Sequence, residues 1–338
     1  MHHLWRNVRA LDDEAYAEFC LAMGEGRLPK VRALGEDMVA LPAAACVTQT
    51  GNAAADEERL LTEVFGDAAD FGAQAAEAAR APLPVTEWDT APGTFLTHIA
   101  ERALLTPRNA DAHDINERLL NRIPAVAGPA NGGVPERTYL SADSIVDTDP
   151  ALAAQYPTEF LNQQESSGLP PHRLRLRVGA VVILLRNVRP RDGLSNGARM
   201  VVTGMKDHLL KAVLLTGAHR GREVLIPRIP LTSTEDTLPF SLRRVQFPVK
   251  LAWALTIDKA QGQTLARAGL FLPRPCFSHG QLYVAFSRVG SFRRIRVLCL
   301  RGRSGKHGLL TDEEAASAGV PAGGVYTRNV VYDEVINA

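Results

Sequence analysis

A run of short β-prone segments in the middle of the 338-residue chain constrains its fold more than any other feature. Glycine-containing turns, such as Asp192-Gly193 and Asn196-Gly197, separate these segments. Strands at this spacing are typical of a small antiparallel barrel or sandwich. The predicted strands are Leu174–Val178, Ala180–Leu185, Ala198–Thr203, Ala212–Leu215 and Glu223–Ile226.

Patterns typical of α/β proteins flank this β-rich segment on both sides. Upstream, the apolar run Ala103–Thr106 ends at Pro107, and Asn109 can cap a helix that carries Ile115. A strand followed directly by a helix is the unit of a parallel sheet, so we expect an all-β module inserted within a parallel α/β domain. Downstream, the sequence predicts a helix-like apolar run, a strand, a helix and a further strand, over Leu251–Ile257, Gly269–Leu272, His279–Phe286 and Ile295–Leu300.

The remaining segments are patterned more weakly. Residues 12–23 carry acids followed by apolar groups, which predicts a helix that ends at Gly24. A second helix is predicted over Glu57–Phe65, inside a stretch rich in Ala, Gly and acids (43–93) that we interpret as an insertion. Residues 124–172 are rich in Pro, Gly, Ser and Asp and predict a long loop with one short strand near Thr138–Leu140.

Composition narrows the class of protein. An apolar content of 46% and a charged content of 22% are ordinary for a globular protein. No stretch approaches the roughly 20 apolar residues that span a bilayer, and the first residues lack the apolar core of a secretory signal. We therefore expect no membrane partner. The cysteines lack Cys-x-x-Cys spacing, which argues against a zinc site or disulfide framework; they are Cys20, Cys46, Cys276 and Cys299.

Charge is unevenly distributed along the chain, although the net charge is only +1. Residues 1–100 carry 7 basic and 16 acidic side chains, whereas residues 240–310 carry 13 basic side chains and a single acid, Asp258. A cluster of one sign is the footprint expected of a surface that binds a polyanion. The alternative is a solvated surface rich in arginine.

Two motifs in this basic segment carry candidate chemistry. The segment Thr256–Thr264 gathers polar groups around Gly262, which would let backbone N–H groups approach a phosphate, while Lys259 supplies a point charge. Simple loop closure is the alternative for such a turn. Arg288 ends the predicted helix Gln281–Ser287, where its guanidinium could reach a transferring phosphoryl group. The alternative for Arg288 is a surface arginine that favours a helix C-terminus.

Together, and in this order, the motifs resemble the Pif family of 5′-to-3′ DNA helicases (superfamily 1, subclass B), especially the helicases fused to rolling-circle Helitron transposons. The resemblance covers nearly the whole chain except residues 43–95, and its last two blocks are the most specific. Four blocks carry it: Leu4-x-x-Asn7-Val8-Arg9 (motif III), Leu105–Asn109 with Ile115-Asn116 (motif IV), Phe247–Pro275 (motif V) and His279–Arg288 (motif VI).

The resemblance implies a second RecA-like domain, with a parallel α/β sheet, into which a small SH3-like β-barrel, the 2B domain, is inserted. Residues 1–99 would then be a remnant of the first motor domain with a connecting segment. The RecA-like domain would comprise residues 100–173 and 246–312, the SH3-like insert residues 174–245, and a C-terminal tail residues 313–338.

The resemblance also implies residue roles. Arg288 would be the arginine finger on the γ-phosphate of ATP, and Arg9 a second phosphate contact. Gln261 and Gly262 would lie near the nucleotide. Four residues would lie near the backbone of single-stranded DNA: Thr106, Asn109, Thr256 and Lys259. The implied cofactors are ATP and Mg²⁺, and the implied setting is DNA repair, recombination and telomere maintenance in the nucleus or mitochondrion.

Two features depart from the family pattern. The family usually has His or Asn where Asp258 stands, and Ser where Ala260 stands; a carboxylate beside DNA phosphates is repulsive. Moreover, no Gly-x-x-x-x-Gly-Lys-[Ser/Thr] motif occurs, because the single Gly-Lys pair, Gly305-Lys306, precedes His307. The acid that would hold Mg²⁺ is missing too. We therefore expect the C-terminal half of a helicase, inactive as an ATPase without a missing N-terminal motor domain.

Two other interpretations stay open on sequence alone. The basic α/β domain with its β insert could be an ATP-independent module that binds single-stranded DNA. The chain could also be a decayed transposon fragment. Trp253 and Tyr283 could stack on bases, but each lies in an apolar run that favours core packing.

Overall fold

The structure is a computed structural model in which residues 13–68, 71–72, 99–123, 136–146, 156–166, 168–233, 239–302 and 306–332 are described. The chain forms two compact units. The first lies within Met1–Asp67, Glu101–Ile115 and Trp253–Ala338, and the second within Ala68–Ala100 and Asn116–Ala252. These bounds differ from the predicted domains, because residues 13–67 group with the α/β part and residues 116–173 with the β-rich part.

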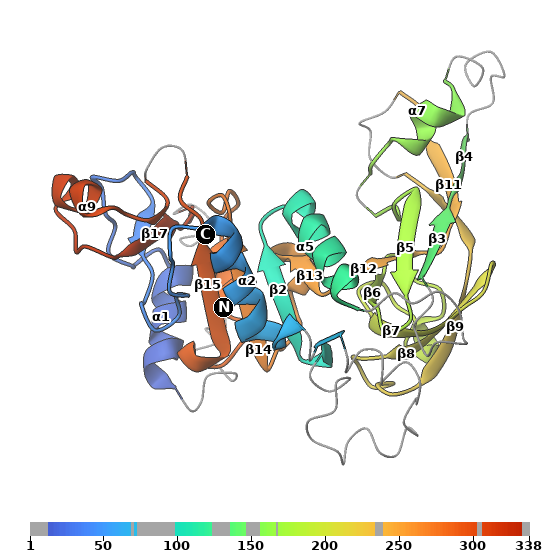
Figure 1. Ribbon diagram of the computed structural model, residues 1–338, viewed down its shortest axis with the longest axis horizontal. Helices are drawn as coiled ribbons and strands as arrows, with labels where there is room; N and C mark the ends of the chain where they lie inside the picture. Colours follow the sequence, from blue (N-terminus) through green and yellow to red (C-terminus); the bar gives the residue numbers. More distant parts are fainter. Residues whose placement is uncertain are drawn as a thin grey trace, which may run out of the picture. The chain divides into compact units, whose positions relative to one another are not determined.

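The first unit is built on a four-stranded parallel sheet (Figure 1). Its strand order is β13 (Ala254–Thr256), β2 (Arg102–Thr106), β14 (Arg267–Leu272) and β15 (Ile295–Cys299). Leu105 pairs with Leu255 on one side and with Leu270 on the other, and all three are buried. Continuous apolar strands of this kind are typical of parallel sheets covered on both faces. The predicted parallel α/β fold is therefore confirmed.

Helix α2 (Ala53–Phe65) packs on this sheet, and Asn52 caps its first turn by accepting from the N–H groups of Ala54 and Ala55. A Cβ at Gly269 of β14 would come within 2.8 Å of Val64, so a residue without a side chain is needed where α2 crosses the strand.

The C-terminal end of α2 is held by two arginines of the sheet. Arg102 donates to the carbonyl of Val64 at 2.8 Å, and Arg267 donates to the carbonyl of Glu63 at 2.7 Å. Cations at this end satisfy carbonyls that lack helical partners and interact favourably with the helix dipole.

Helix α1 (Glu14–Gly24) packs against α8 (Gln281–Phe286), and both helices were predicted from the sequence. Asp13 caps α1 by accepting from the N–H of Tyr16. The buried Tyr16 hydroxyl in turn donates to the carbonyl of Phe286 at 2.6 Å, which fixes the C-terminal end of α8. The position of Ser287 and Arg288 just beyond this end is thereby set by α1.

A small antiparallel sheet completes the first unit. It contains β1 (Met38–Ala40), β17 (Val325–Arg328) and β16 (Gly308–Leu309), and α9 (Asp312–Ala318) precedes β17. A shared core joins these elements, made of Leu34, Met38, Leu310, Ala315 and Tyr326. Residues 313–332, which the sequence placed in a tail, are therefore folded into this unit.

The second unit contains the predicted β-rich module. Its largest sheet is antiparallel, in the order β12 (Val249–Leu251), β6 (Val181–Leu184), β7 (Arg199–Met205), β8 (Leu209–Leu214) and β9 (Glu223–Pro227). Four of the five predicted segments therefore lie in one sheet. The fifth, β5 (Arg173–Arg177), pairs instead with β3 (Glu136–Leu140).

Within residues 124–172 the short strand predicted near Thr138–Leu140 is confirmed as β3. The rest of the predicted loop is wrong in its described part, because it contains β4 (Ala142–Ile145) and α7 (Thr158–Asn162). Strand β4 joins β11 (Leu242–Gln246) and β10 (Ile229–Thr232) in a three-stranded sheet. Likewise, the run over Leu251–Ile257, predicted to be helix-like, is extended, with β12 and β13 followed by the short 3₁₀ turn η4 (Ile257–Ala260).

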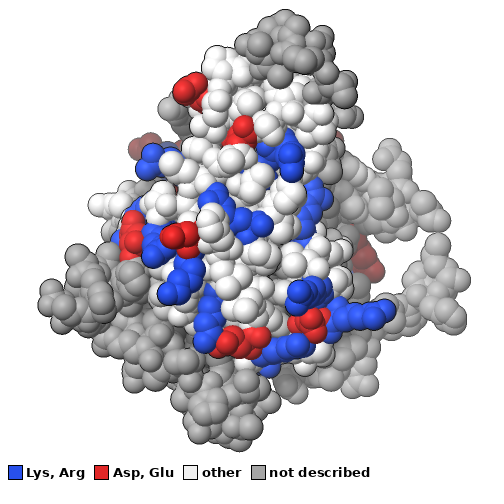
Figure 2. All heavy atoms as spheres, turned by 90° about the vertical axis from the view of Figure 1, so that its right-hand side faces the viewer, with Lys and Arg blue, Asp and Glu red and all other residues white. Residues whose placement is uncertain are grey.

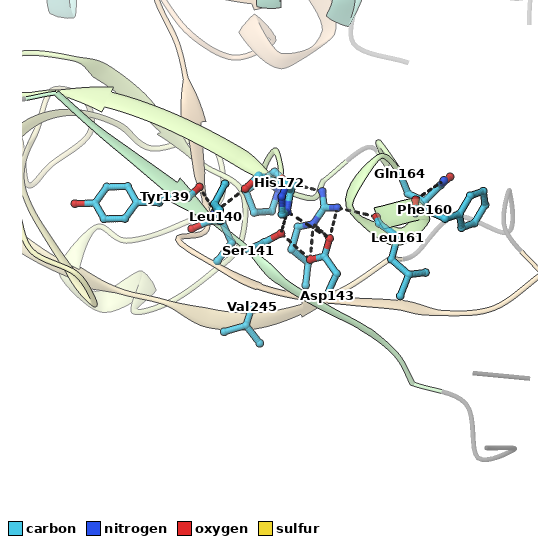
Figure 3. Close-up of polar contacts among 12 residues, drawn as sticks. Tyr139, Leu140, Ser141, Asp143, Phe160, Leu161, Gln164, His172 and Val245 are labelled. Carbon is cyan, nitrogen blue, oxygen red and sulfur yellow. Dashed lines mark hydrogen bonds and ion pairs between the residues drawn. The ribbon is translucent and has the colours of Figure 1, made fainter. Parts of the chain in front are cut away.

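A buried ion pair joins β4 to β11 in this sheet (Figure 3). The Arg244 side chain is 1% exposed and the Asp143 side chain 0%, and Arg244 Nη2 lies 2.7 Å from Asp143 Oδ2. Arg244 Nη1 also donates to the carbonyl of Pro170 and Nη2 to that of Leu161, while Ser141 Oγ donates to Asp143 Oδ1. The pair therefore ties β4 and β11 to the segments that carry α7 and Pro170.

A second buried arginine, Arg199 of β7, binds the residues at which the chain passes between the two units. Its Nη1 donates to the carbonyl of Ala100 at 3.1 Å, and its Nη2 donates to those of Ile99 at 3.3 Å and Ala252 at 3.2 Å. Burial lowers the pKa of this guanidinium to about 10. Arg199 thus fixes both connecting segments on the side of the second unit.

Candidate nucleic-acid interface

Two threonines lie side by side where neighbouring strands of the parallel sheet end. Thr106 is the last residue of β2 and pairs in register with Thr256, the last residue of β13. Both are buried, and Thr106 Oγ1 donates to the carbonyl of Arg108 at 2.9 Å, which shapes the turn into α5 (Asn109–Arg122). Ligands of α/β sheets bind at the carboxyl ends of the strands, so this edge is the natural place for a site.

Lys259 follows Thr256 within η4 and belongs to the same edge. It is only partly exposed, and burial lowers the pKa of its ammonium group. Its backbone carbonyl accepts from Gln263 Nε2 at 3.2 Å. A partly desolvated cation next to two hydroxyl residues is suited to a phosphate oxygen, because a phosphate would restore the stabilisation of its charge that burial removes. Three of the four predicted DNA contacts thus lie together, and Asn109, exposed at the start of α5, lies just beyond Arg108.

Residues 260–263 form a tight turn beside Lys259. The N–H of Gln263 donates to the carbonyl of Ala260 at 3.0 Å, and Gln261 has φ −56° and ψ 134°. Gly262 follows with φ +82°, so this is a type II turn, which requires a positive φ at its third residue. Gln261 and Gly262 are exposed at the apex of the turn.

An exposed aromatic residue next to this edge was missed by the sequence interpretation. The Phe277 ring is 53% exposed, and the Arg108 guanidinium lies 5.7 Å from its centroid. Arg274 is also exposed. Burial raises the pKa of Asp111, and the positive charges of Arg274 and Arg108 oppose this shift. Phe277 lies in an irregular segment, so neither strand nor helix periodicity indicates that it is exposed. The one sequence feature that could have pointed to it is an aromatic residue placed between a proline-rich turn and Gly280.

The two aromatic residues that the sequence did single out have other environments. Trp253 is fully buried, as its apolar run predicted. Tyr283 is 38% exposed, and its ring packs against Gly24 at the end of α1, where an added Cβ would lie 3.1 Å from Tyr283 Cδ2. Arg9, the other predicted phosphate contact, lies outside the described residues.

The guanidinium of Arg288 points into the protein rather than outward. Arg288 is 6% exposed, and its Nη1 donates to the carbonyls of Ala260 at 3.3 Å and Gln263 at 3.1 Å. Its Nε donates to Val284 O at 2.8 Å and its Nη2 to Ser287 Oγ at 2.7 Å. The structure therefore brings the two sequence motifs into direct contact, with Arg288 bound to the turn that follows Lys259.

The charge excess of residues 240–310 is only partly available at a surface. Arg244 and Arg288 are buried, and Arg296 forms an ion pair with Glu63 at 2.7 Å. Glu63 comes from the acidic first third of the chain, so folding itself neutralises part of the asymmetry. The exposed cations near the sheet edge therefore indicate a polyanion-binding surface better than the number of basic residues along the sequence does.

Charges of both signs are interspersed on the face of the second unit seen in Figure 2. Ion pairs of this unit include Lys211 with Glu223 at 2.7 Å and Arg137 with Asp207 at 2.6 Å. In the described residues of this unit Lys and Arg outnumber Asp and Glu, so ion pairs neutralise only part of its positive charge.

Metal and membrane features were also sought within the described ranges. These residues include no group of three His, Cys, Asp or Glu side chains that could hold a metal ion. No helix among them is both long and apolar enough to cross a bilayer.

The carboxyl edge of this parallel α/β sheet, with a lysine and an exposed aromatic ring beside it, is where α/β proteins commonly bind ligands. Comparison with known proteins shows similarity to one family of DNA helicases. Residues 159–205 match the family of the DNA helicase Pif1 2B domain. The chain is 34% identical over 187 residues to the human ATP-dependent DNA helicase PIF1, covering 54% of this chain and 25% of the relative. It is 36% identical over 121 residues to the ATP-dependent DNA helicase PIF6 of Trypanosoma brucei, covering 35% and 15%.

Over part of its length, the chain is therefore similar to DNA helicases of the Pif1 family. Among solved structures, the Pif1 helicase of Candida albicans matches 72% of this chain and 56% of that chain, with 23% identity and a TM-score of 0.42. The similarity to Pif1 helicases therefore rests on the sequence matches. The chain spans about a quarter or less of the length of the curated relatives named above.

Proposed function

We propose that the first unit binds the backbone of single-stranded DNA at the carboxyl edge of β2 and β13, as part of an ATP-dependent helicase. The observation that carries this proposal is the convergence of Thr106, Thr256 and Lys259 at one sheet edge. Lys259, which is partly exposed, supplies an ammonium group that binds phosphate without reading bases, while the buried Thr106 shapes the edge through its hydrogen bond to Arg108. This suits a protein that moves along DNA of any sequence.

Arg108 and Phe277 extend this site. The exposed ring offers a surface on which an unstacked base can lie, and the guanidinium beside it can bind a phosphate or stack on the base. Single-stranded DNA, whose bases are free to stack on side chains, fits this pair better than a duplex does. Two DNA-bound Pif1 structures are among the structural neighbours of the chain.

The proposal extends to ATP through the similarity to Pif1 helicases. Arg288, Arg9, Gln261 and Gly262 would face the nucleotide, which supplies the energy for 5′-to-3′ translocation. The 338-residue sequence contains no phosphate-binding Gly-Lys-[Ser/Thr] loop. Its described part contains no group of three side chains that could hold a metal ion. We therefore expect the 338 residues alone to bind DNA but not to hydrolyse ATP, and a further motor domain to complete the nucleotide site.

The domain assignment is also part of the proposal. The 2B family match supports an inserted 2B domain in the second unit, and the antiparallel sheet of β6–β9 with β12 is compatible with an SH3-like barrel over residues 174–245. A helicase of this family would act on chromosomal DNA in the nucleus or mitochondrion.

A fluorescence anisotropy titration with a labelled single-stranded oligonucleotide tests the proposal. Substituting Lys259→Ala should weaken binding by about 5- to 10-fold at low salt, since one phosphate contact is lost. Lys306→Ala removes a lysine that is exposed and follows a different strand, so it serves as the matched control and should change binding less than twofold. Equal affinities of wild type and Lys259→Ala would refute this site.

A separate assay of DNA-stimulated ATP hydrolysis tests the expectation about ATP. The 338 residues alone should not hydrolyse ATP, whereas hydrolysis abolished by Arg288→Ala would mean that they already form a complete motor.

A further inference from the structure

We infer that Arg288 is a positioning residue for the DNA-binding edge when no nucleotide is bound, and that its guanidinium holds the turn 260–263 in the conformation that presents Lys259. This inference rests on the proposed DNA-binding function and adds a role for Arg288 that does not involve ATP.

The first observation is that the guanidinium of Arg288 donates hydrogen bonds to both ends of the turn. Nη1 is shared between the carbonyls of Ala260 and Gln263, the first and last residues of the type II turn. A single nitrogen that bridges both ends of a turn restrains the turn as a unit, because either end can move only by losing a charge-assisted hydrogen bond.

The second observation is that Arg288 is itself rigidly held. Its Nε donates to Val284 O and its Nη2 to Ser287 Oγ, so the planar group is fixed against α8. Ser287 Oγ also donates to Val284 O at 3.0 Å. The backbone carbonyl of Arg288 accepts from the N–H of Leu265 at 2.9 Å, just after the turn. The turn is therefore attached to a fixed helix end by both the side chain and the backbone of one residue.

The third observation connects this turn to Lys259. Gln263 is the residue that Arg288 holds at the end of the turn, and its Nε2 donates to the carbonyl of Lys259. Ala260, held at the other end, is the next residue along the chain from Lys259. Movement of either end would therefore move the backbone that carries the lysine. Arg288 is buried, with 6% of its surface exposed. The restraint is strong because a water molecule cannot readily replace the guanidinium there.

A consequence follows for a nucleotide-bound state. If Arg288 leaves these carbonyls to contact a phosphoryl group, the turn loses the restraint and the DNA contact at Lys259 weakens. The same side chain would then report the state of the nucleotide to the DNA site by exchanging one set of acceptors for another.

The test measures binding of a labelled oligo(dT) without nucleotide or Mg²⁺, using the full chain. Arg288→Ala should weaken binding about tenfold, and Arg288→Lys should stay several-fold weaker than wild type, because one ammonium cannot replace a planar fork bound to four acceptors. Arg293→Ala removes an exposed arginine of the same unit and should change binding less than twofold. Full rescue by Arg288→Lys would show that only charge matters and would overturn the inference.

Two further measurements keep the result interpretable if Arg288→Ala is less stable. Amide hydrogen exchange should be faster in residues 260–265 of the variant, with protection in β14 and β15 unchanged; unaltered exchange at 260–265 would contradict the inference. In the Lys259→Ala background, Arg288→Ala should cost less than threefold, because its effect passes through that lysine. Absence of DNA binding by wild type would instead refute the proposed function, whereas wild-type binding that Arg288→Ala leaves unchanged would refute this inference alone.

Discussion

The buried pair between Arg244 and Asp143 gives the sharpest stability prediction. In Asp143→Ala the guanidinium would stay in a site where it is 1% exposed, without the carboxylate that now accepts three of its hydrogen bonds at 2.7–3.2 Å. Removing one partner of a buried ion pair typically costs about 3–5 kcal/mol, because the desolvated charge that remains is uncompensated. The carbonyls of Pro170 and Leu161 offset part of this cost, so we expect about 3–4 kcal/mol for the second unit.

Urea unfolding followed by amide hydrogen exchange in β4 and β11 measures this loss. With an m value of about 2 kcal/mol per molar, the midpoint for these peptides should fall by about 1.5–2 M. The double variant Asp143→Leu/Arg244→Met removes both charges and should recover most of the loss, since apolar groups of similar volume often replace buried ion pairs without destabilisation.

The matched control is the exposed pair of Asp192 and Arg222, whose side chains are 37% and 49% exposed at a separation of 3.0 Å. Asp192→Ala should cost no more than about 1 kcal/mol. If Asp143→Ala costs as little as this control, the pair is hydrated in solution and the reasoning is wrong. A double variant less stable than either single variant would likewise contradict it.

Three further predictions concern the first unit. Gly308→Ala should destabilise it by about 2–3 kcal/mol in thermal unfolding, because φ is +95° and the new Cβ would lie 2.9 Å from the backbone of Arg301; a change below about 0.5 kcal/mol would contradict this. Burial lowers the pKa of His307, which hydrogen-bonds to the carbonyl of Leu272. Its contribution to stability is therefore present above pH 6.5 and is lost as the pH falls through the lowered pKa. His307→Gln should make the melting temperature depend less on pH over this range. Asp258→Asn should strengthen binding of single-stranded DNA by about 2- to 5-fold at low salt and have little effect at high salt, which anisotropy titrations at both salt concentrations would reveal.

The sequence predicted the parallel α/β architecture because its strands β2, β14 and β15 are continuous apolar runs with turn residues at their ends. The run at Leu251–Ile257 was misassigned, since a short apolar run has the same composition in a buried strand and in a buried helix. The run is extended because Leu255 pairs with Leu105 of β2. This pairing is a long-range contact that the local sequence does not reveal.

Strand β4 could not be predicted for a different reason. Its residues, Ala142–Ile145, include Asp143 and Ser144, which are poor strand formers. The strand exists because β11 pairs with it and Arg244 neutralises Asp143 in the interior. No local pattern contains that information.

The candidate site was predicted in part. Family motifs identified Thr106, Thr256 and Lys259 before the fold placed them at one edge. The direction of the Arg288 guanidinium depends on carbonyls presented by a turn 25 residues away, so a motif could locate the residue but not its hydrogen-bond partners. Phe277 was missed because exposure in an irregular segment leaves no periodic signal.

The most direct test of the account is the salt dependence of single-stranded DNA binding by wild type and Lys259→Ala. If Lys259 contacts a phosphate, the plot of log K against log salt should be shallower in the variant by about 0.7, the value expected for one lost phosphate contact on a single strand. Lys306→Ala should keep the wild-type slope. Identical slopes for wild type and Lys259→Ala, or wild-type binding that does not respond to salt, would contradict the central claim that this sheet edge holds the DNA backbone.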